Sequence, residues 1–391
     1  MKRKRVLFIL TYFDCGGICR SLQNYLNLYD EAKYEIDVFA MVHDGMFCGE
    51  FKKCRILKKD NVIHALISRY GHVKGVRRIQ CALIKALRKL FGVSFQDFLF
   101  KRAGNHLLSH SKYDTVVAFS EGVPSRFVSF MKHSNKVAWI HCDYSSYVKG
   151  LSKPDERFVY NKFQRIVCVS SYTKDIFVEY YPELCGRTTF IYNIQDSEMM
   201  KSMACQTETP LFDKGSFNIV SVGRIDPVKR FSIIPRIASE VKKLCMEANV
   251  TINWYIIGPK GGAPNEYNSL INNIKKYRVE DAVNLIGEKS NPYYHIGHAD
   301  LLVNTSVSEA CPYVINEAKI LGTPCVCANF GSAKEFIQDG INGYVVPVEQ
   351  MSKIIFSLIL NKELYDSLKL RLSSYNYDNR ILLSQYEEVL Q

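Results

Sequence analysis

The sequence has no uncharged apolar run of about 18 residues, no Cys-x-x-Cys pair and no Asp-x-Asp pair. The first absence argues against a transmembrane helix. The second, with an odd total of thirteen scattered cysteines, argues against a zinc site and a disulfide framework, so we expect reduced thiols in a cytoplasmic protein. The third argues against paired aspartates that hold a metal ion on a diphosphate, and we expect no metal site and no cofactor.

What the sequence does contain is typical of a folded globular protein, with 47% hydrophobic and 23% charged residues. A length of 391 residues exceeds what one hydrophobic core usually supports, so we expect two domains. The beginning, MKRKRVLFILTYFDCGG, is basic and then apolar like a signal peptide, but the apolar run stops at Asp14 and no small-residue cleavage site follows. We therefore interpret it as the first β-strand of a soluble or peripheral protein.

Positive charge is concentrated in one segment. Fourteen Lys and Arg and only two acids lie between Lys52 and Arg102, an excess that equals the net charge of +12 of the whole chain. Within it, residues 74–91 follow a helical pattern with apolar side chains on one side and basic side chains on the other. The apolar side is predicted to hold Val76, Ile79, Leu83, Ile84, Leu87, Leu90 and Phe91.

Two interpretations of this helix stay open. It is either a surface helix packed on its own domain with a solvated basic face, or a helix that contacts anionic lipid headgroups on the inner face of the cell membrane. The chain has no recognition motif for nucleic acid, so we expect no nucleic acid partner.

Apolar runs alternate with helical patterns in two series along the chain, which predicts two parallel α/β sheets with right-handed crossovers. The first series holds strands at 6–11, 34–39, 115–119, 136–140 and 165–169, and the second holds strands at 217–223, 251–258, 283–286, 301–304, 324–328 and 343–346. The polar stretch 193–216 between them is predicted to be an irregular linker. Residues 373–391 are predicted to form a helix after a polar turn. Ligands of such folds bind at the carboxyl ends of the strands.

One apolar helix of the second series carries a carboxylate. In the stretch SEACPYVINEAKILGTP, Pro312 fits the first helical position and Gly322 the residue just past the end, which predicts a helix over about 313–321. Glu309 precedes its first turn and Glu317 lies inside it, where an unpaired ionised carboxylate is costly. The free N–H groups of the first turn form an anion site. A ligand with phosphate and neighbouring hydroxyls, such as a nucleotide sugar, would satisfy both glutamates.

Three further junctions between a strand and a loop carry candidate residues. Gly16 and Gly17 follow the first strand, where absent side chains let a phosphate or sugar approach the backbone. Arg224 and Lys229 follow a strand of the second series, where two cations can hold a diphosphate and stabilise charge on a leaving group. His141 follows a strand of the first series and could hydrogen-bond a sugar hydroxyl. Alone, each also fits an ordinary structural role.

Together these features resemble family 4 glycosyltransferases. The resemblance covers nearly the whole chain, and the motifs that carry it are strand-Gly-Gly, His141, V-S-S at 169–171, Tyr192-Asn193, VGR…K at 222–229, and E-x7-E at Glu309 and Glu317 followed by SAKEFIQDGINGYVVP. It implies a GT-B architecture, in which two Rossmann-like α/β domains face each other across a cleft and a final helix crosses back onto the first domain. The implied acceptor-side domain is 1–195 plus 373–391, and the implied nucleotide-sugar-binding domain is 196–372.

The resemblance also implies roles for the residues of the second domain. Glu317 would accept hydrogen bonds from the donor's ribose hydroxyls, and Glu309 would lie near the transferred sugar. Backbone N–H groups would help to hold sugar and phosphate in the segment Cys311, Pro312, Tyr313 and Val314. Many relatives have a glycine and an aromatic residue where this chain has Ala310-Cys311, which leaves the choice of donor open.

The remaining candidates are assigned in the same way. Arg224 and Lys229 match a diphosphate clamp, and His141 matches a contact to the sugar. Gly16 and Gly17 match a loop near the donor phosphate and the acceptor.

The sequence therefore favours a retaining, metal-independent glycosyltransferase. It would move a hexose or N-acetylhexosamine from a UDP-linked donor to a glycan acceptor, lipid-linked by analogy, in the biosynthesis of a surface polysaccharide such as a capsule. The departing phosphate could itself act as base toward the acceptor hydroxyl. The alternative is a catalytically silent subunit that binds glycan or stabilises a partner enzyme, and a two-domain epimerase or phosphorylase is disfavoured by the E-x7-E spacing.

Overall fold

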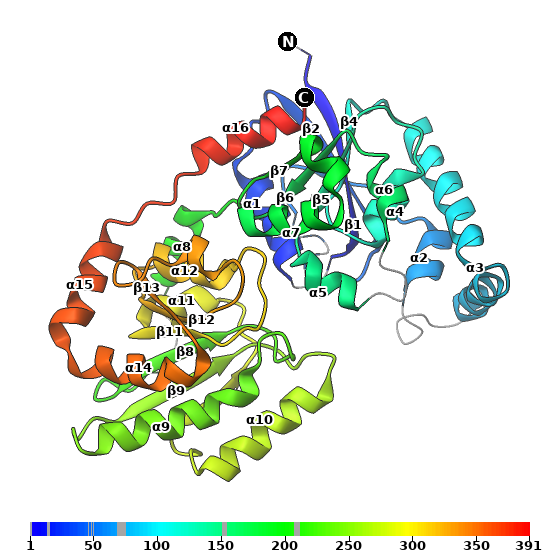
Figure 1. The fold of residues 1–391 in the computed structure, drawn as a ribbon. Helices are drawn as coiled ribbons and strands as arrows, with labels where there is room; N and C mark the ends of the chain where they lie inside the picture. Colours follow the sequence, from blue (N-terminus) through cyan, green and yellow to red (C-terminus); the bar gives the residue numbers. More distant parts are fainter. Residues whose placement is uncertain are drawn as a thin grey trace. The chain divides into compact units, whose positions relative to one another are not determined.

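The computed structural model describes residues 2–13, 16–45, 47, 49, 51–68, 76–150, 155–206 and 212–391. The chain forms two compact units, which are drawn in Figure 1. The first comprises Met1–Ile194 and Asn379–Gln391, and the second comprises Gln195–Asp378. The sequence-based boundaries lie after residues 195 and 372.

The first unit is built on a parallel sheet of seven strands in the order β3-β2-β1-β4-β5-β6-β7. β1 pairs on both sides, so that Ile9 lies opposite Phe39 of β2 and Ala118 of β4. Leu7 and Phe8, which point to opposite faces, are both fully buried, as expected where helices cover both faces of a parallel sheet. The strands are β1 (Lys4–Tyr12), β2 (Tyr34–Val42), β3 (Arg55–Ile56), β4 (Thr115–Ala118), β5 (Lys136–Ile140), β6 (Arg165–Cys168) and β7 (Thr188–Phe190).

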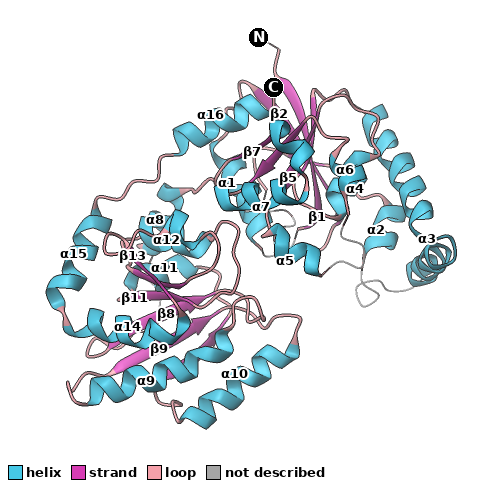
Figure 2. Ribbon diagram, in the orientation of Figure 1, coloured by secondary structure: helices cyan, strands magenta, loops and turns pink. Residues whose placement is uncertain are grey.

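Helices lie on both sides of this sheet (Figure 2). One face packs against α2, α3, α4, α6 and α7 in a core that includes Phe39, Phe100 and Phe127, and the other packs against α1 and α16 through aromatic rings. The helices are α1 (Gly17–Leu28), α2 (Asn61–Ile67), α3 (Val76–Ser109), α4 (Val123–Ser129), α5 (Tyr144–Lys149), α6 (Arg157–Tyr160), α7 (Ser171–Tyr180) and α16 (Asn379–Val389).

Helix α16 joins the first unit from the far end of the sequence, as predicted for the final helix. Tyr386 stacks on Tyr25 of α1, with ring centroids 4.5 Å apart. The Thr115 hydroxyl donates to the Leu390 carbonyl at 2.9 Å, and Lys33 and Glu387 form an ion pair at 2.9 Å. The C-terminal part of this helix is therefore held by residues of the first unit.

The second unit is built on a parallel sheet of six strands in the order β10-β9-β8-β11-β12-β13. One face packs against α9, α10, α14 and α15, and α8, α11 and α12 pack together in a separate apolar cluster. The strands are β8 (Phe217–Val222), β9 (Ile252–Ile257), β10 (Val283–Gly287), β11 (Leu301–Asn304), β12 (Cys325–Ala328) and β13 (Gly343–Val346). The helices are α8 (Ser197–Ala204), α9 (Ile234–Met246), α10 (Pro264–Tyr277), α11 (Pro292–His298), α12 (Tyr313–Ile320), α13 (Ala333–Phe336), α14 (Met351–Leu360) and α15 (Lys362–Ser373). Two Rossmann-like units with parallel sheets confirm the predicted fold class.

The prediction of an irregular linker over 193–216 is wrong for its first half, where α8 forms. Asp196 caps this helix by accepting from the Met199 N–H at 3.1 Å. Met200 is fully buried in a cluster with Tyr293 and Ile320. The apolar residues at 199, 200, 203 and 204 do recur with helical spacing, but the helix is only eight residues long. A pattern this short is a weak signal, and the stability of the helix comes from these tertiary contacts. Residues 207–211 lie outside the described part of the chain.

The predicted basic helix is part of a longer element. Lys74 lies outside the described residues, and α3 begins at Val76 and ends at Ser109. Gly92 interrupts it with non-helical backbone angles, φ 67° and ψ −153°, in a region that favours glycine. Within the described residues, no helix has both the length and the apolar character needed to cross a membrane.

Candidate functional site

Two loops meet at the carboxyl edge of the second unit's sheet, after the neighbouring strands β8 and β11. The Val307 N–H donates to the Val228 carbonyl at 2.9 Å. The Thr305 hydroxyl donates to the Lys229 carbonyl at 2.7 Å, and Arg230 Nε donates to the Thr305 carbonyl at 3.2 Å. These hydrogen bonds hold the loop after β8 against the loop that leads to α12.

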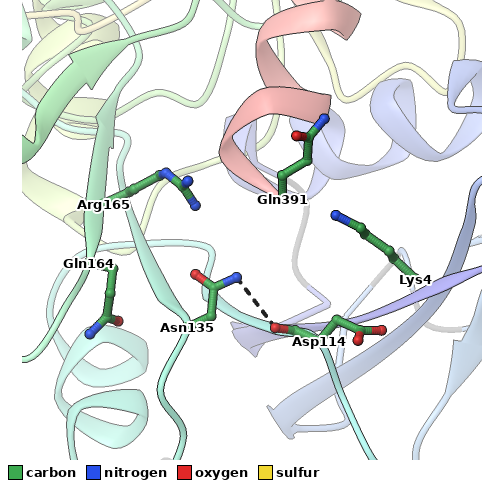
Figure 3. Close-up of a pocket in the computed structure, with 6 residues that line it drawn as sticks. All are labelled: Lys4, Asp114, Asn135, Gln164, Arg165 and Gln391. Atoms are coloured by element: carbon green, nitrogen blue, oxygen red, sulfur yellow. Dashed lines mark hydrogen bonds between the residues drawn. The ribbon is translucent and has the colours of Figure 1, made fainter.

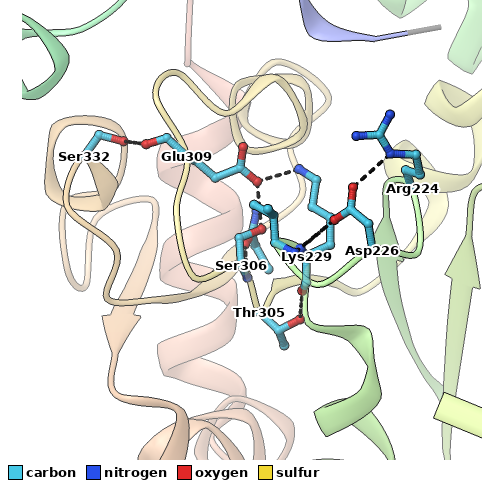
Figure 4. Close-up of polar contacts among 9 residues, drawn as sticks. Arg224, Asp226, Lys229, Thr305, Ser306, Glu309 and Ser332 are labelled. Atoms are coloured by element: carbon cyan, nitrogen blue, oxygen red, sulfur yellow. Dashed lines mark hydrogen bonds and ion pairs between the residues drawn. The ribbon is translucent and has the colours of Figure 1, made fainter. Parts of the chain in front are cut away.

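Lys229 and Glu309, which the sequence predicted as site residues, are in direct contact (Figure 4). Lys229 Nζ lies 2.5 Å from Glu309 Oε1, and the side chains are 23% and 15% exposed. The Ser306 hydroxyl donates to the same carboxylate oxygen at 2.7 Å, and the Ser332 hydroxyl donates to the Glu309 carbonyl at 2.8 Å. Glu309 is thus fixed at both its backbone and its carboxylate, and the cation beside it is compensated.

Arg224 reaches this group through an aspartate that the sequence did not single out. Arg224 Nε donates to Asp226 Oδ2 at 2.9 Å, with Arg224 57% exposed. The other oxygen of Asp226 accepts from the N–H groups of Val228 and Lys229 at 3.1 and 3.0 Å. An aspartate that accepts from N–H groups two and three residues ahead forms a tight turn. The signal in the sequence is the Asp-Pro pair of RIDPVKR, which is typical of a turn.

Two glycines allow the backbone at this edge to pack closely. Gly223 and Gly258 follow β8 and β9, with φ of 151° and 148°. A Cβ atom on Gly258 would lie 2.0 Å from the Gly223 carbonyl oxygen, and one on Gly223 would lie 3.1 Å from Lys229 Cε. The place of the Lys229 side chain therefore depends on the absence of side chains at both positions. Gly223 stands in the VGR…K motif, but nothing in the sequence indicated that it packs against Gly258, which ends the next strand.

Helix α12 begins beside Glu309, with the predicted anion site at its first turn. Pro312 is the N-cap residue rather than the first helical residue, and its side chain makes no cap hydrogen bond. Cys311, Pro312 and Val314 are buried, whereas Tyr313 is half-buried. The helix ends at Ile320 and is followed by Gly322, which has φ 76°.

Glu317 is buried inside α12, at 7% exposure, as its apolar surroundings in the sequence predicted. Two residues on, Lys319 is also buried. Its Nζ donates to the Phe336 carbonyl at 2.8 Å and lies 5.0 Å from the Tyr375 ring centroid. Burial lowers the pKa of Lys319 to about 8. Both charged side chains of this helix are thus drawn into the interior of the second unit.

The other predicted residues lie at the carboxyl edge of the first unit's sheet. His141 directly follows β5, and its ring lies edge-on to Phe119 with centroids 4.8 Å apart. Burial lowers the pKa of His141 to about 3, so the imidazole is neutral. Gly16 precedes α1 with extended backbone and open space around its Cα, and Gly17 is the first residue of the helix. The conformation of Gly16 does not itself require glycine.

A hollow in the first unit lies at the opposite edge of the sheet (Figure 3). It has a volume of about 470 Å³ and is lined by Lys4, Asp114, Asn135, Gln164, Arg165 and Gln391. These residues lie at the amino ends of β1, β4, β5 and β6 or next to the chain end, whereas ligands of parallel α/β sheets bind at carboxyl ends. The candidate site is therefore not this hollow. In the described part of the chain, no three His, Cys, Asp or Glu side chains are grouped as metal ligands would be.

Comparison with known proteins assigns a class to the second unit. Residues 206–373 match the family described as Glycosyl transferases group 1. The match covers α12 and the loops that carry Arg224, Lys229, Glu309 and Glu317. The second unit is thus similar to group 1 glycosyltransferases.

Three proteins illustrate its relatives. An uncharacterized glycosyltransferase of Haemophilus influenzae is 26% identical over 178 residues, which is 44% of this chain and 48% of that protein. The N-acetyl-alpha-D-glucosaminyl L-malate synthase of Bacillus anthracis is 26% identical over 130 residues, which is 32% of this chain and 34% of that protein. The chain thus aligns with half or less of each of these relatives. Among solved structures, Anabaena HepE in complex with UDP and glucose is 18% identical, with a TM-score of 0.74 and 99% of both chains covered.

Proposed function

We propose that the protein is a retaining, metal-independent glycosyltransferase that moves a hexose or N-acetylhexosamine from a UDP-linked donor to a glycan acceptor. The observation that carries the proposal is the contact between Lys229 and Glu309 at the start of α12. A cation, a carboxylate and the first turn of a helix thus lie together at the edge where α/β sheets bind ligands. The group 1 match over the same residues and the UDP-bound relative of the same fold support it.

In this scheme the donor replaces contacts that the protein now makes with itself. The diphosphate takes Lys229 and Arg224 as its clamp, and it also accepts hydrogen bonds from N–H groups at the start of α12. Glu309, released from Lys229, accepts hydrogen bonds from the hydroxyls of the transferred sugar. Glu317 binds the ribose hydroxyls, while His141 and the Gly16–Gly17 loop contact sugar, phosphate and acceptor.

Transfer forms a bond from the acceptor oxygen to the anomeric carbon and breaks the bond from that carbon to the diphosphate. The acceptor's proton passes to the departing diphosphate oxygen, so no side-chain base is needed. The negative charge that grows on the diphosphate meets Lys229, Arg224 and the positive end of α12. Removing one such donor typically costs about 10² to 10³ in rate.

We also propose that the acceptor is presented at an anionic membrane surface, to which α3 binds. Ile79, Leu83 and Leu90, which the sequence placed on the apolar side of the helix, are 71%, 60% and 75% exposed instead of buried. Cys81 and Ile84 face α2. An exposed apolar row on a strongly basic segment fits acyl chains and anionic headgroups together. A lipid-linked glycan of a surface polysaccharide is the acceptor that such a surface would carry.

The test is the release of UDP, or another nucleoside diphosphate, from a panel of nucleotide sugars in the presence of a chelator. We expect one donor to be turned over by the wild type, and turnover to fall by about 10² to 10³ in Lys229→Ala and to collapse in Glu317→Ala. Lys289→Ala and Glu349→Ala, at exposed positions of the same unit, serve as matched controls. Turnover that stops with chelator would contradict the metal-independent mechanism.

Measuring UDP binding gives a second test. Glu309→Gln removes the charge that now compensates Lys229, so we expect UDP to bind more tightly while sugar transfer falls. Silence of the wild type across the panel, repeated with lipid acceptors, together with glycan binding, would instead identify a catalytically silent subunit.

A further inference from the structure

Glu121 lies at the carboxyl edge of the first unit's sheet, between β4 and α4. β4 and β5 are paired, with Ala118 opposite Ala138, so the loops that follow them are neighbours. Glu121 Oε2 accepts a hydrogen bond from the backbone N–H of His141 at 2.9 Å. The Cys142 thiol hydrogen-bonds the same carboxyl group. One side chain thus holds the first two residues after β5, although no motif in the sequence pointed to it.

The imidazole of His141 is kept in a state suited to a hydroxyl ligand. It is neutral because burial lowers its pKa to about 3. Its Nε2 atom is buried and has no hydrogen-bond partner among the described residues. A neutral imidazole nitrogen can donate to or accept from a sugar hydroxyl, but only if the backbone that carries the ring stays in place.

A second carboxyl group holds the helix that follows His141. The hydroxyls of Tyr144 and Tyr147 on α5 donate to Glu156 at 3.2 and 3.4 Å. Asp143 caps the same helix by accepting from the Ser145 N–H at 3.1 Å. The turn that carries His141 is therefore fixed by Glu121 at its start and, through α5, by Glu156.

Both carboxyl groups lie in a low-polarity environment. Burial raises the pKa of Glu121 and of Glu156, and the charge of Glu121 adds to the rise at Glu156. The charged and titratable groups around the pair are Arg126, His141, Cys142, Tyr144, Tyr147, Tyr160, Cys168 and Tyr181. Of these only Arg126 carries a positive charge that opposes the rise at Glu156.

We propose that Glu121 is a positioning residue for glycosyl transfer: its carboxyl group fixes the backbone of His141 and so the place of the imidazole that meets the sugar. The inference rests on the proposed function, in which His141 contacts the transferred sugar. Glu121 touches no substrate and acts only through His141. Misplacing a contact group by about 1 Å can cost about 10² in rate.

The test is a double-mutant cycle of Glu121→Ala and His141→Ala, measured as kcat/KM for donor turnover. We expect each single variant to lose about 10 to 10²-fold, and the double variant to be no worse than His141→Ala, because Glu121 then has nothing to position. Glu179→Ala, an exposed glutamate of the same unit, should match the wild type. If the loss of kcat/KM in the double variant equals the product of the two single losses, the inference is overturned.

A conservative variant separates positioning from folding. Glu121→Gln keeps an oxygen that can accept from the His141 N–H, so we expect this variant to retain most of the activity. The backbone amide hydrogen of His141 should exchange slowly with solvent in Glu121→Gln and fast in Glu121→Ala. The pH profile of kcat/KM should also lose one ionisation above the usual glutamate range in Gln. An amide equally protected in Ala overturns the inference whatever the activity. A wild type that turns over no donor refutes the proposed function, while amide exchange still decides the contact.

Discussion

At the scale of single residues, the geometry of the site depends on residues whose type does not indicate ligand binding. The sequence pointed to Lys229, Arg224 and Glu309 because cations and carboxylates after strands indicate chemistry. Their arrangement is set by Asp226, which forms the turn, and by Gly258, which lets two loops touch. The role of Gly258 becomes visible only when the neighbouring strand is known, because this residue contacts a loop that is distant in the sequence. Asp226 shapes only the local backbone, so its position after a strand indicates a turn and not a ligand.

Gly258 gives a prediction at this scale. A Cβ atom there would overlap the Gly223 carbonyl oxygen, and φ of 148° is unfavourable for other residues. We expect Gly258→Ala to lower the free energy of unfolding by about 2 kcal/mol or more, and to lower donor turnover because Gly223 and Lys229 must move. Denaturant unfolding and turnover are measured together.

The matched control lies four residues away. Gly262 has open space around its Cα, so Gly262→Ala should behave like the wild type. Equal stability and turnover of the two variants would show that the close approach of the two loops is not needed.

At the scale of elements, helices whose surroundings are polar or unusual were the hardest to predict. Helix α8 was missed because it is only eight residues long and because its apolar side is covered by α11 and α12, which lie far from it in the sequence. Helix α3 was predicted with a helical period, but the period alone does not say whether its apolar side is covered. The side chains of Ile79, Leu83 and Leu90 are largely exposed. A surface helix that packs on its own domain would normally bury such an apolar row.

The exposed row of α3 leads to a vesicle-binding prediction. We expect the protein to sediment with vesicles that contain anionic lipid and not with neutral ones, and Leu83→Glu with Leu90→Glu to abolish sedimentation, because these side chains would have to enter the headgroup layer. Arg88→Glu with Lys89→Glu should weaken it in a salt-dependent way.

Leu370→Glu provides the control, because Leu370 is 74% exposed on α15 outside the basic segment. A membrane role for α3 would be contradicted if Leu370→Glu lost vesicle binding to the same extent. It would also be contradicted if the α3 variants still bound vesicles. Dimerisation that is lost in the α3 variants would point to a second copy as the partner.

At the scale of the whole molecule, the sequence predicted both sheets, because continuous apolar strands such as Val6–Ile9 and Ile219–Val220 are buried on both faces. It also predicted that the final helix returns to the first unit, on the strength of the family resemblance. What it could not give is which residues of different elements touch, since Lys229 and Glu309 are 80 positions apart. Pairings of this kind are set by strand order, which is a property of the complete fold.

The return of α16 gives a prediction at this scale. Tyr386 is fully buried against Tyr25 and Trp139, so Tyr386→Ala should lower the free energy of unfolding of the first unit by about 3–5 kcal/mol. Ile381→Ala, on the exposed side of the same helix, should cost less than about 0.5 kcal/mol.

The two tryptophans make the measurement selective. Trp139 belongs to the first unit and Trp254 to the second, so fluorescence in a Trp254→Phe background follows the first unit and in a Trp139→Phe background the second. A transition that Tyr386→Ala shifts equally in both backgrounds would show that the units unfold as one.

The discontinuous make-up of the first unit also bears on the order in which the chain is synthesised. The ribosome completes residues 195–378, the whole second unit, before it adds α16. Until then the sheet face that carries Phe8 and Trp139 lacks one of its two covering helices. The nascent protein therefore holds one finished globule and one with an open aromatic face, a species that chaperones would be expected to bind.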